Sequence, residues 1–158
     1  MRIRLHLRLP KIPLFDPKQV ETIIFKEVFI ALNTTIESLT TDVKLDTPVD
    51  TGVLRASIFG RIWREPGNRF MGEVASGKQA PYAIFVEEDT RPHWPPMAAL
   101  EGWARRHNVS AILVARAISR RGTKGRHMFA KNLAKWRPLF QPALERAVSR
   151  IARSLQGL

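Results

Sequence analysis

The sequence contains no cysteine, which excludes a disulfide scaffold and any metal site built on thiolates. It also has no apolar run near the roughly 18 residues that a membrane-spanning helix needs. The first nine residues, MRIRLHLRL, alternate charged and apolar side chains, so they lack the continuous apolar core of a signal peptide. We therefore expect a protein made in a reducing cytoplasm without disulfides, membrane spans or a cleaved leader.

Acidic side chains are almost missing from the last third of the chain. Residues 1–101 hold 13 lysines and arginines and 13 acids, whereas residues 102–158 hold 13 lysines and arginines and one acid, Glu145. The net charge of +12 therefore resides in the last third. Such a segment attracts polyanions at low salt, but a solvated helical surface has the same composition, and the charge count does not separate the two.

Constellations that carry chemistry are scarce. There is no G-x-S-x-G motif and no H-E-x-x-H motif, and the four histidines stand apart along the chain, at His6, His93, His107 and His127. The sequence GTKG at 122–125 lacks the spacing of a phosphate loop and is interpreted as a basic turn. The three acids at 87–89 indicate an acidic loop start, because a metal would need further oxygen ligands from elsewhere. We expect no catalytic residue, no cofactor and no metal.

The patterns that are present indicate one α+β domain, residues 1–158. Alternation over Met1 to Leu9 predicts a strand, within an N-terminal segment at 1–13 that contains two prolines. Asp16 and Pro17 are typical of a helix start. Apolar residues at helical spacing then predict a long helix over about 17–45.

Turn signals and changes of periodicity divide the rest of the chain. In order they predict a strand at 57–64, a turn at 65–68, a strand at 70–76, a third strand or extended segment at 82–87, and helices at 96–107, 110–120 and 138–155. The first two of these helices fall in a predicted insertion, 92–127, which contains a basic loop. This order predicts a long N-terminal helix packed on a small, mainly antiparallel sheet, with a helical insertion and a C-terminal helix.

The long helix carries more apolar side chains than one stripe requires. Phe25, Phe29 and Ile36 lie off its main face, where solvent seldom wets two phenylalanines. Either the helix is sandwiched within its own domain or a neighbouring subunit covers it. We favour the neighbour and take the three residues as a candidate oligomer interface.

The stretch TPVDTGVLRASI, Thr47–Ile58, holds the most information. Pro48 is expected to end the long helix, because the residue before a proline avoids the helical conformation. Asp50 or Thr51 is expected to accept from exposed amides at the start of a helical turn, and Gly52 to relieve the backbone at that junction. The stretch is therefore predicted to form a rigid corner between helix and sheet, which needs no substrate.

The same stretch, followed by a hairpin and then Y-A-x-x-V-E, resembles the neck or tail-completion proteins of long-tailed bacteriophages. Members of this family are often described as minor tail components or head–tail joining proteins. Two later stretches, at 94–108 and 117–129, resemble the longer members that carry a helical insertion. The chain departs from the pattern at Asp89, where members commonly have glycine, and at 126–129, where members often have a proline–phenylalanine pair. The matching residues are Pro48, Val49, Asp50, Thr51, Gly52, Leu54, Arg55, Ser57, Ile58, Tyr82, Ala83, Val86 and Glu87.

The resemblance implies a structural virion protein, assembled in the host cytoplasm, that joins the head connector to the tail. It further implies a homo-oligomeric ring around the DNA channel and contacts with head-completion and tail proteins, even where the isolated chain is a monomer. Within that hypothesis the basic loop is expected to contact DNA or an acidic partner through Arg120, Arg121, Lys124 and Arg126. The alternative is a free basic nucleic-acid-binding protein, which explains the charge but not the corner; a small enzyme ranks third.

Overall fold

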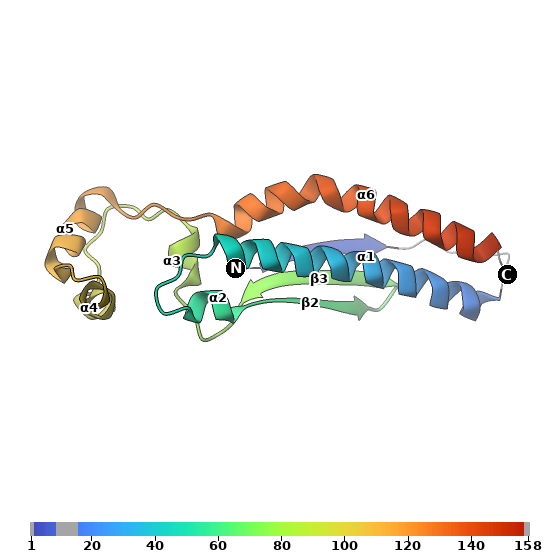
Figure 1. The fold of residues 1–158 in the computed structure, drawn as a ribbon, viewed down its shortest axis with the longest axis horizontal. Helices are drawn as coiled ribbons and strands as arrows, with labels where there is room; N and C mark the ends of the chain where they lie inside the picture. The colour runs from blue at the N-terminus through green and yellow to red at the C-terminus, as the bar shows by residue number, and fades with distance from the viewer. Residues whose placement is uncertain (1, 9–15, 157–158) are drawn as a thin grey trace.

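The computed structural model describes residues 2–8 and 16–156 of the chain. Figure 1 shows an elongated body in which two long helices run along a small sheet, with two short helices set apart at one end. The mixed α+β class expected from the sequence is confirmed. The elements in chain order are β1 (Arg2–Arg8), α1 (Pro17–Asp46), α2 (Val53–Ser57), β2 (Ile58–Glu65), β3 (Arg69–Ser76), α3 (Ala83–Glu87), α4 (Met97–Arg106), α5 (Ala111–Arg121) and α6 (Met128–Gln156).

Helix α1 begins and ends as its terminal residues predict. The Asp16 carboxylate accepts a hydrogen bond from the backbone N–H of Lys18 at 3.1 Å, and Pro17 occupies the first turn. The helix ends at Asp46, and Thr47 is already extended ahead of Pro48.

The sheet has three antiparallel strands in the order β1-β3-β2. The N-terminal strand predicted from alternation is present as β1, whereas Pro10 and Pro13 lie outside the described residues. The hairpin predicted around residues 65–68 joins β2 to β3, and its turn holds Gly67 and Asn68 at positive φ.

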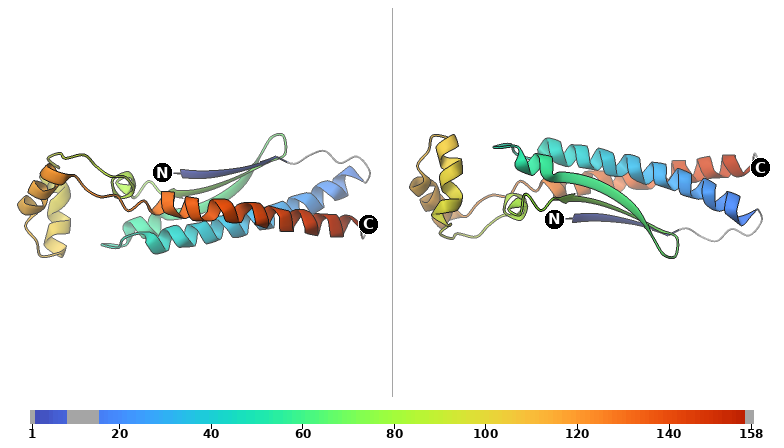
Figure 2. Two further views of the ribbon diagram at one scale, coloured as in Figure 1. Left: turned by 90° about the horizontal axis from the view of Figure 1, so that it is seen from above. Right: turned by 90° about the horizontal axis from the view of Figure 1, so that it is seen from below.

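One face of the sheet lies directly beneath α1. A Cβ added at Gly72 of β3 would lie 2.8 Å from two side-chain carbons of Ile36, and one added at Gly60 of β2 would lie 2.4 Å from Thr40 Oγ1. The glycines therefore let the helix backbone approach the strands closely. Both views in Figure 2 show α1 and α6 on this side of the sheet.

The segment 82–87 is not the third strand or extended segment that its β-branched and aromatic residues predict. It forms the short helix α3, in which the backbone N–H of Glu88 donates to the carbonyl of Ile84 at 2.9 Å. Helical spacing places Ala83 and Glu87 on one face, and both are buried. Tertiary packing therefore overrides the local strand preference.

Helix α6 begins ten residues earlier than the sequence predicts, at Met128 instead of Pro138. Pro138 and Pro142 lie inside the helix, and both are exposed. A proline removes one helical hydrogen bond, but on an exposed face water can satisfy the freed carbonyl. Helix α6 therefore continues through both prolines and runs along α1.

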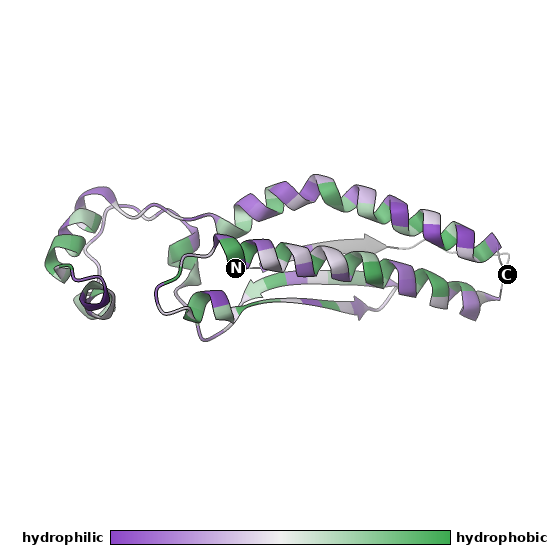
Figure 3. Cartoon of the chain, viewed as in Figure 1, coloured by the Kyte–Doolittle hydropathy of each residue, from purple (hydrophilic) through white to green (hydrophobic). Residues whose placement is uncertain are grey.

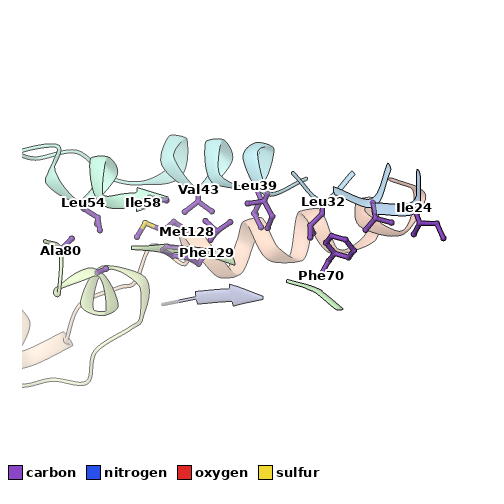
Figure 4. Close-up of a cluster of buried hydrophobic side chains, with 14 of the residues drawn as sticks. Ile24, Leu32, Leu39, Val43, Leu54, Ile58, Phe70, Ala80, Met128 and Phe129 are labelled. Carbon is purple, nitrogen blue, oxygen red and sulfur yellow. The ribbon is translucent and has the colours of Figure 1, made fainter. Parts of the chain in front are cut away.

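The core forms where α1, the sheet and the start of α6 meet. Figure 4 shows Leu39 and Val43 of α1 beside Met128 and Phe129 of α6, while Leu32 lies beside Phe70 of β3. Each of these side chains is at most 4% exposed. Full burial of one such side chain stabilises the fold by about 1.5–3 kcal/mol, so this cluster fixes α1 between sheet and α6.

Polar contacts fix the register of α1 against α6. The carboxylate of Asp42 accepts from Lys135 Nζ and from the indole N–H of Trp136, each at 2.7 Å. These two hydrogen bonds, with that of Lys135 the larger influence, lower the pKa of Asp42. One turn further along, Asn132 donates to Asp46 at 2.7 Å.

Candidate interaction surfaces

The corner at Thr47–Ile58 forms as a hinge between α1 and β2, but its polar residues act differently from the prediction. Gly52 begins α2 with φ at 81°, a left-handed conformation that glycine adopts without a steric penalty. No side chain caps α2, so the expectation that Asp50 or Thr51 caps it is wrong. Leu54 is 5% exposed and joins the core.

Arg55 and Ser57 of the corner form their hydrogen bonds within the chain. The Arg55 guanidinium donates to the carbonyl of Thr47 at 3.0 Å, which closes the hinge across the turn. The Ser57 hydroxyl donates to the carbonyl of Leu54 at 2.7 Å, and the carbonyl of Ser57 accepts from the N–H of Gly77 at 2.9 Å. Together with the half-buried Pro48, these bonds hold the corner in one conformation between α1 and β2.

Asp50 contacts the helical insertion instead of capping a helix. Its carboxylate accepts from Arg106 Nε at 2.9 and 3.1 Å, forms an ion pair with the same guanidinium, and lies 3.3 Å from His107 Nε2. The hydrogen bond from Arg106 is the main reason why the pKa of Asp50 is lowered. A residue of the corner therefore ties the end of α4 to the body.

Glu87, one of the matching residues, is buried and bonds to the start of α6. It is fully buried, and its two carboxylate oxygens accept from the backbone N–H groups of Phe129 and Ala130 at 3.1 and 2.9 Å. It therefore satisfies the open N-terminus of α6 and adds a negative charge where the helix dipole favours one. Tyr82, in contrast, begins α3 with no side-chain cap and is 42% exposed.

Two chain segments, 86–91 and 122–127, run alongside each other and connect the body to α4 and α5; we call this pair the stalk. Thr90 and Thr123 bond to each other through backbone and hydroxyl groups at 2.8–2.9 Å. Nearer the body, the N–H of Arg126 donates to the carbonyl of Val86 at 2.8 Å. Figure 1 shows the stalk between α3 and the separate pair α4–α5, which we call the arm.

The glycines of GTKG are explained by the stalk and not by a phosphate loop. A Cβ at Gly125 would overlap the carbonyl oxygen of Glu87. A Cβ at Gly122, whose φ is +70°, would overlap the carbonyl oxygen of Thr90. Asp89, where the resembling family commonly has glycine, accepts from the N–H of Gly125 at 2.7 Å. Asp89 thus stabilises the stalk, while Glu87 stabilises the start of α6.

The four basic residues singled out in the sequence lie along the arm and the stalk. Arg120 and Arg121 form the end of α5, while Lys124 and Arg126 lie in the stalk segment 122–127, which leads back to the body. All four side chains are exposed. The structure therefore presents them to solvent as one stretch of chain without packing them into a pocket.

The candidate oligomer interface on α1 needs correction for one of its three residues. Ile36 is 2% exposed and packs against the chain's own sheet, so sandwiching within the domain, the alternative to a neighbour, explains it. Phe25 is half-buried and packs edge-on against Phe70 with the Arg64 guanidinium 3.6 Å from its ring centre. It lines an open groove of about 420 Å³ together with Phe29, which is 49% exposed.

A further cluster was not found from the sequence. Glu73 of β3 is fully buried, yet it is surrounded by the guanidinium groups of Arg2, Arg4 and Arg61 from the two flanking strands. The signal was present in an acid within the otherwise apolar strand FMGEVAS and in the arginines of the alternating N-terminus. Only the strand order joins the two signals.

The part of the chain that the structure describes contains neither a helix suited to cross a membrane nor a cluster of metal ligands. Over 2–8 and 16–156, no helix combines the length and the apolar character needed to cross a bilayer. The same residues contain no group of three or more His, Cys, Asp or Glu side chains placed to hold a metal ion. Comparison of the chain with protein-family models, with curated proteins and with solved structures finds no match.

Proposed function

We propose that this protein is a structural component of a bacteriophage virion, at the junction between head and tail. In this proposal it joins the head connector to the tail as part of a ring around the DNA channel, and it has no catalytic role and no cofactor. The observation that carries the proposal is the corner at Thr47–Ile58. Its sequence resembles that of neck and tail-completion proteins, and its polar groups hold α1, α4 and β2 in place within the chain.

The packing of the matching stretches supports the same proposal. Leu54 of the first stretch, Ala83 of the second and Met128 at the start of α6 belong to one buried cluster, part of which Figure 4 shows. Stretches separated in sequence are thus one structural unit. A unit of this kind is expected if the shared residues specify a scaffold and not a reaction.

The arm supports a role in assembly. It stands apart from the body, and the colouring in Figure 3 marks hydrophobic residues along α5. Ile112 and Leu113 are 53% and 64% exposed, and Trp94 at the entrance to the arm is 58% exposed. Two helices of 10 and 11 residues cannot cover these side chains alone, so a neighbour in a larger assembly is the natural cover.

A free nucleic-acid-binding protein is the second candidate. The observation that favours it is the exposed basic stretch Arg120–Arg126 on a chain of net charge +12. It leaves the corner and the exposed apolar residues of the arm without a role. The two candidates differ in where the protein is found after particles have been purified.

Quantitative mass spectrometry of purified particles tests the proposal. The expected result is that this chain is enriched with the particles, at a low copy number that stays fixed relative to the major capsid protein through a density gradient. Nuclease-treated particles are the control, because a protein that merely coats exposed DNA is lost with it. Recovery of the chain only in the soluble lysate would contradict the proposal and favour the second candidate.

A further inference from the structure

Within residues 2–8 and 16–156, no helix covers the face of the sheet opposite α1 in either view of Figure 2. Gly60 and Gly72 point toward α1, and side chains alternate along a strand, so odd-numbered residues of β2 and β3 point the other way. The register places Arg4 and Arg61 on either side of Glu73. This open face therefore includes Arg2, Arg4, Phe59, Arg61, Trp63 and Glu73, together with the buried Met71 and Ala75 and, at its end, the ion pair of Glu65 and Arg69.

Positive charge dominates the open face, although an acid lies at its centre. Arg61 holds one oxygen of Glu73 firmly, at 2.7 Å from both Nε and Nη2. Arg2 and Arg4 lie farther from the other oxygen, with Nε at 3.4 and 3.6 Å, and that oxygen accepts no hydrogen bond from any residue that the structure describes. Glu73 is fully buried, while the three arginine side chains are 50–61% exposed, so solvent meets the cations and not the anion.

The arginines retain most of their donors. A guanidinium has five N–H donors, and Glu73 lies within bonding distance of only two on Arg61. Arg2 and Arg4 are attracted to the carboxylate at distances too long for a good hydrogen bond. The buried anion therefore keeps three guanidinium groups together while leaving them able to bind a second, external anion.

That anion is not supplied by a second copy of the chain. Two copies would each bring a net charge of +12. Five further acidic side chains are already held by basic groups of their own chain: Glu21 by Arg64, Glu27 by Arg150, Asp42 by Lys135, Asp50 by Arg106 and Glu65 by Arg69. Charge complementarity instead requires a partner with many uncompensated negative charges.

The face offers little for a single strand to stack on: of its two aromatic side chains, Phe59 is 39% exposed and Trp63 is already held by its own chain. Proteins bind single strands largely by stacking bases on exposed aromatic rings. The Trp63 ring already lies 5.0 Å from the Arg61 guanidinium, and its indole N–H donates to Glu65 at 3.3 Å. A duplex hides its bases and offers only phosphates, which are the groups that these arginines can bind.

We infer that the open face of the sheet binds the phosphate backbone of duplex DNA through Arg2, Arg4 and Arg61, without sequence preference. The inference does not rest on a position in a virion, since it follows from the charge and geometry of the isolated chain. It also differs from the expectation for the basic loop, which lies on the arm and the stalk.

The test is fluorescence anisotropy of the full chain, tagged at its C-terminus, with a short labelled duplex of arbitrary sequence between about 50 and 200 mM salt. The double variant R2Q/R4Q leaves the Arg61–Glu73 pair intact, so the buried acid keeps its partner. The matched control R137Q/R146Q removes the same charge from two exposed positions on α6. Thermal unfolding confirms that each variant is folded.

The expected result is weaker binding by R2Q/R4Q, with the slope of log K against log salt reduced by about 1 for each arginine lost. The control is expected to change the slope by less than half as much. Equal losses in the two double variants would overturn the inference, because they would indicate diffuse attraction. Tighter binding to a polyglutamate or to an unpaired strand than to the duplex would overturn it as well.

A gain of charge provides a second and independent readout. Phe59 is 39% exposed on the open face, so Phe59→Lys adds a cation beside the arginines without opening the core. It should tighten duplex binding and raise the slope by about 1, as expected for one further phosphate contact. Val148→Lys, at a 62% exposed position of α6, is the control. An equal gain in both variants would contradict a binding face on the sheet.

Discussion

At the residue scale, buried acids have defined partners that their sequence neighbours do not reveal. Glu87 lies in a run of three acids, and its pattern indicates an acidic loop. In the fold it is the cap of a helix that begins 41 residues later along the chain, at Met128. The i,i+4 spacing of Ala83 and Glu87 was the available signal, but a five-residue helix is too short for periodicity to establish it.

Replacing Glu87 by alanine should destabilise the protein by about 2–4 kcal/mol, because two N–H groups in the first turn of α6, one of them buried, lose their acceptor and its charge. Glu87→Gln retains an acceptor and should cost about half as much. Urea unfolding followed by circular dichroism measures both. Glu88→Gln, on an exposed neighbour, is the control and should stay within about 0.5 kcal/mol of the parent. If Glu87→Ala matched this control, the capping role would be wrong.

Gly72→Ala should also destabilise, by about 1–3 kcal/mol, because the new methyl group would lie 2.8 Å from Ile36 and 3.2 Å from Leu32. The measurement is the midpoint of thermal unfolding. Gly102→Ala in α4 is the matched control: its Cβ would approach nothing closer than 3.4 Å, and alanine favours the helix. A midpoint unchanged by Gly72→Ala would show that α1 does not press on the sheet.

At the element scale, periodicity and turn chemistry predicted the elements with strong local signals. The hairpin at 65–68, the cap at Asp16 and the alternating N-terminal strand have such signals, and each is confirmed. The start of α6 was missed because Pro138 is a typical first residue of a helix, although here it lies in the middle of one. The sequence left the sandwiching of α1 within its own domain as an open alternative. The part of α6 before Pro138, which was not predicted as helix, contacts α1 through the bonds of Lys135 and Trp136 to Asp42.

The attachment of the arm to the body should depend on pH. The pKa of Asp50 is lowered in the folded protein, so its ion pair with Arg106 stabilises the docked arm fully above the ordinary pKa of 3.8. This contribution is lost as the pH falls below 3.8 and through the lowered value. Asp50→Asn should have the same effect at neutral pH.

Hydrogen exchange with mass spectrometry measures this attachment. Asp50→Asn should speed exchange in α4, whereas amides of α1 and β3 keep their protection, because the arm opens without the core. Thr51→Ala, a change at an adjacent exposed position, is the control. Faster exchange throughout the body, or none in α4, would show that Asp50 does not hold the arm.

At the scale of the whole molecule, charge is divided between compensated and exposed groups. Two acids of α1 are matched by basic residues of α6: Asp42 by Lys135 and Glu27 by Arg150. Arg120, Arg121, Lys124 and Arg126 instead lie in the last third of the chain, whose one acid is Glu145. The sequence predicted the location of the excess charge, but the basic cluster around Glu73 depends on strand order, which no local pattern specifies.

Charge reversal at Arg120, Arg121, Lys124 and Arg126 should weaken salt-sensitive, sequence-independent DNA binding by the purified chain. The loss should be largest at low salt, where release of counterions from DNA contributes most. Filter binding at several salt concentrations measures it. A variant that still bound DNA as the parent does would refute a role for the basic loop, and would leave the open face of the sheet as the contact.

The most direct test of the proposed function is electron microscopy of particles produced when the gene for this chain is deleted. A role at the head–tail junction predicts DNA-filled heads and separate tails that do not join, with normal particles restored by supplying the chain in trans. Restoration should fail when the corner is disrupted by Gly52→Val, whose left-handed backbone position a β-branched residue cannot adopt without strain. Intact tailed particles from the deletion strain would contradict a role at the head–tail junction.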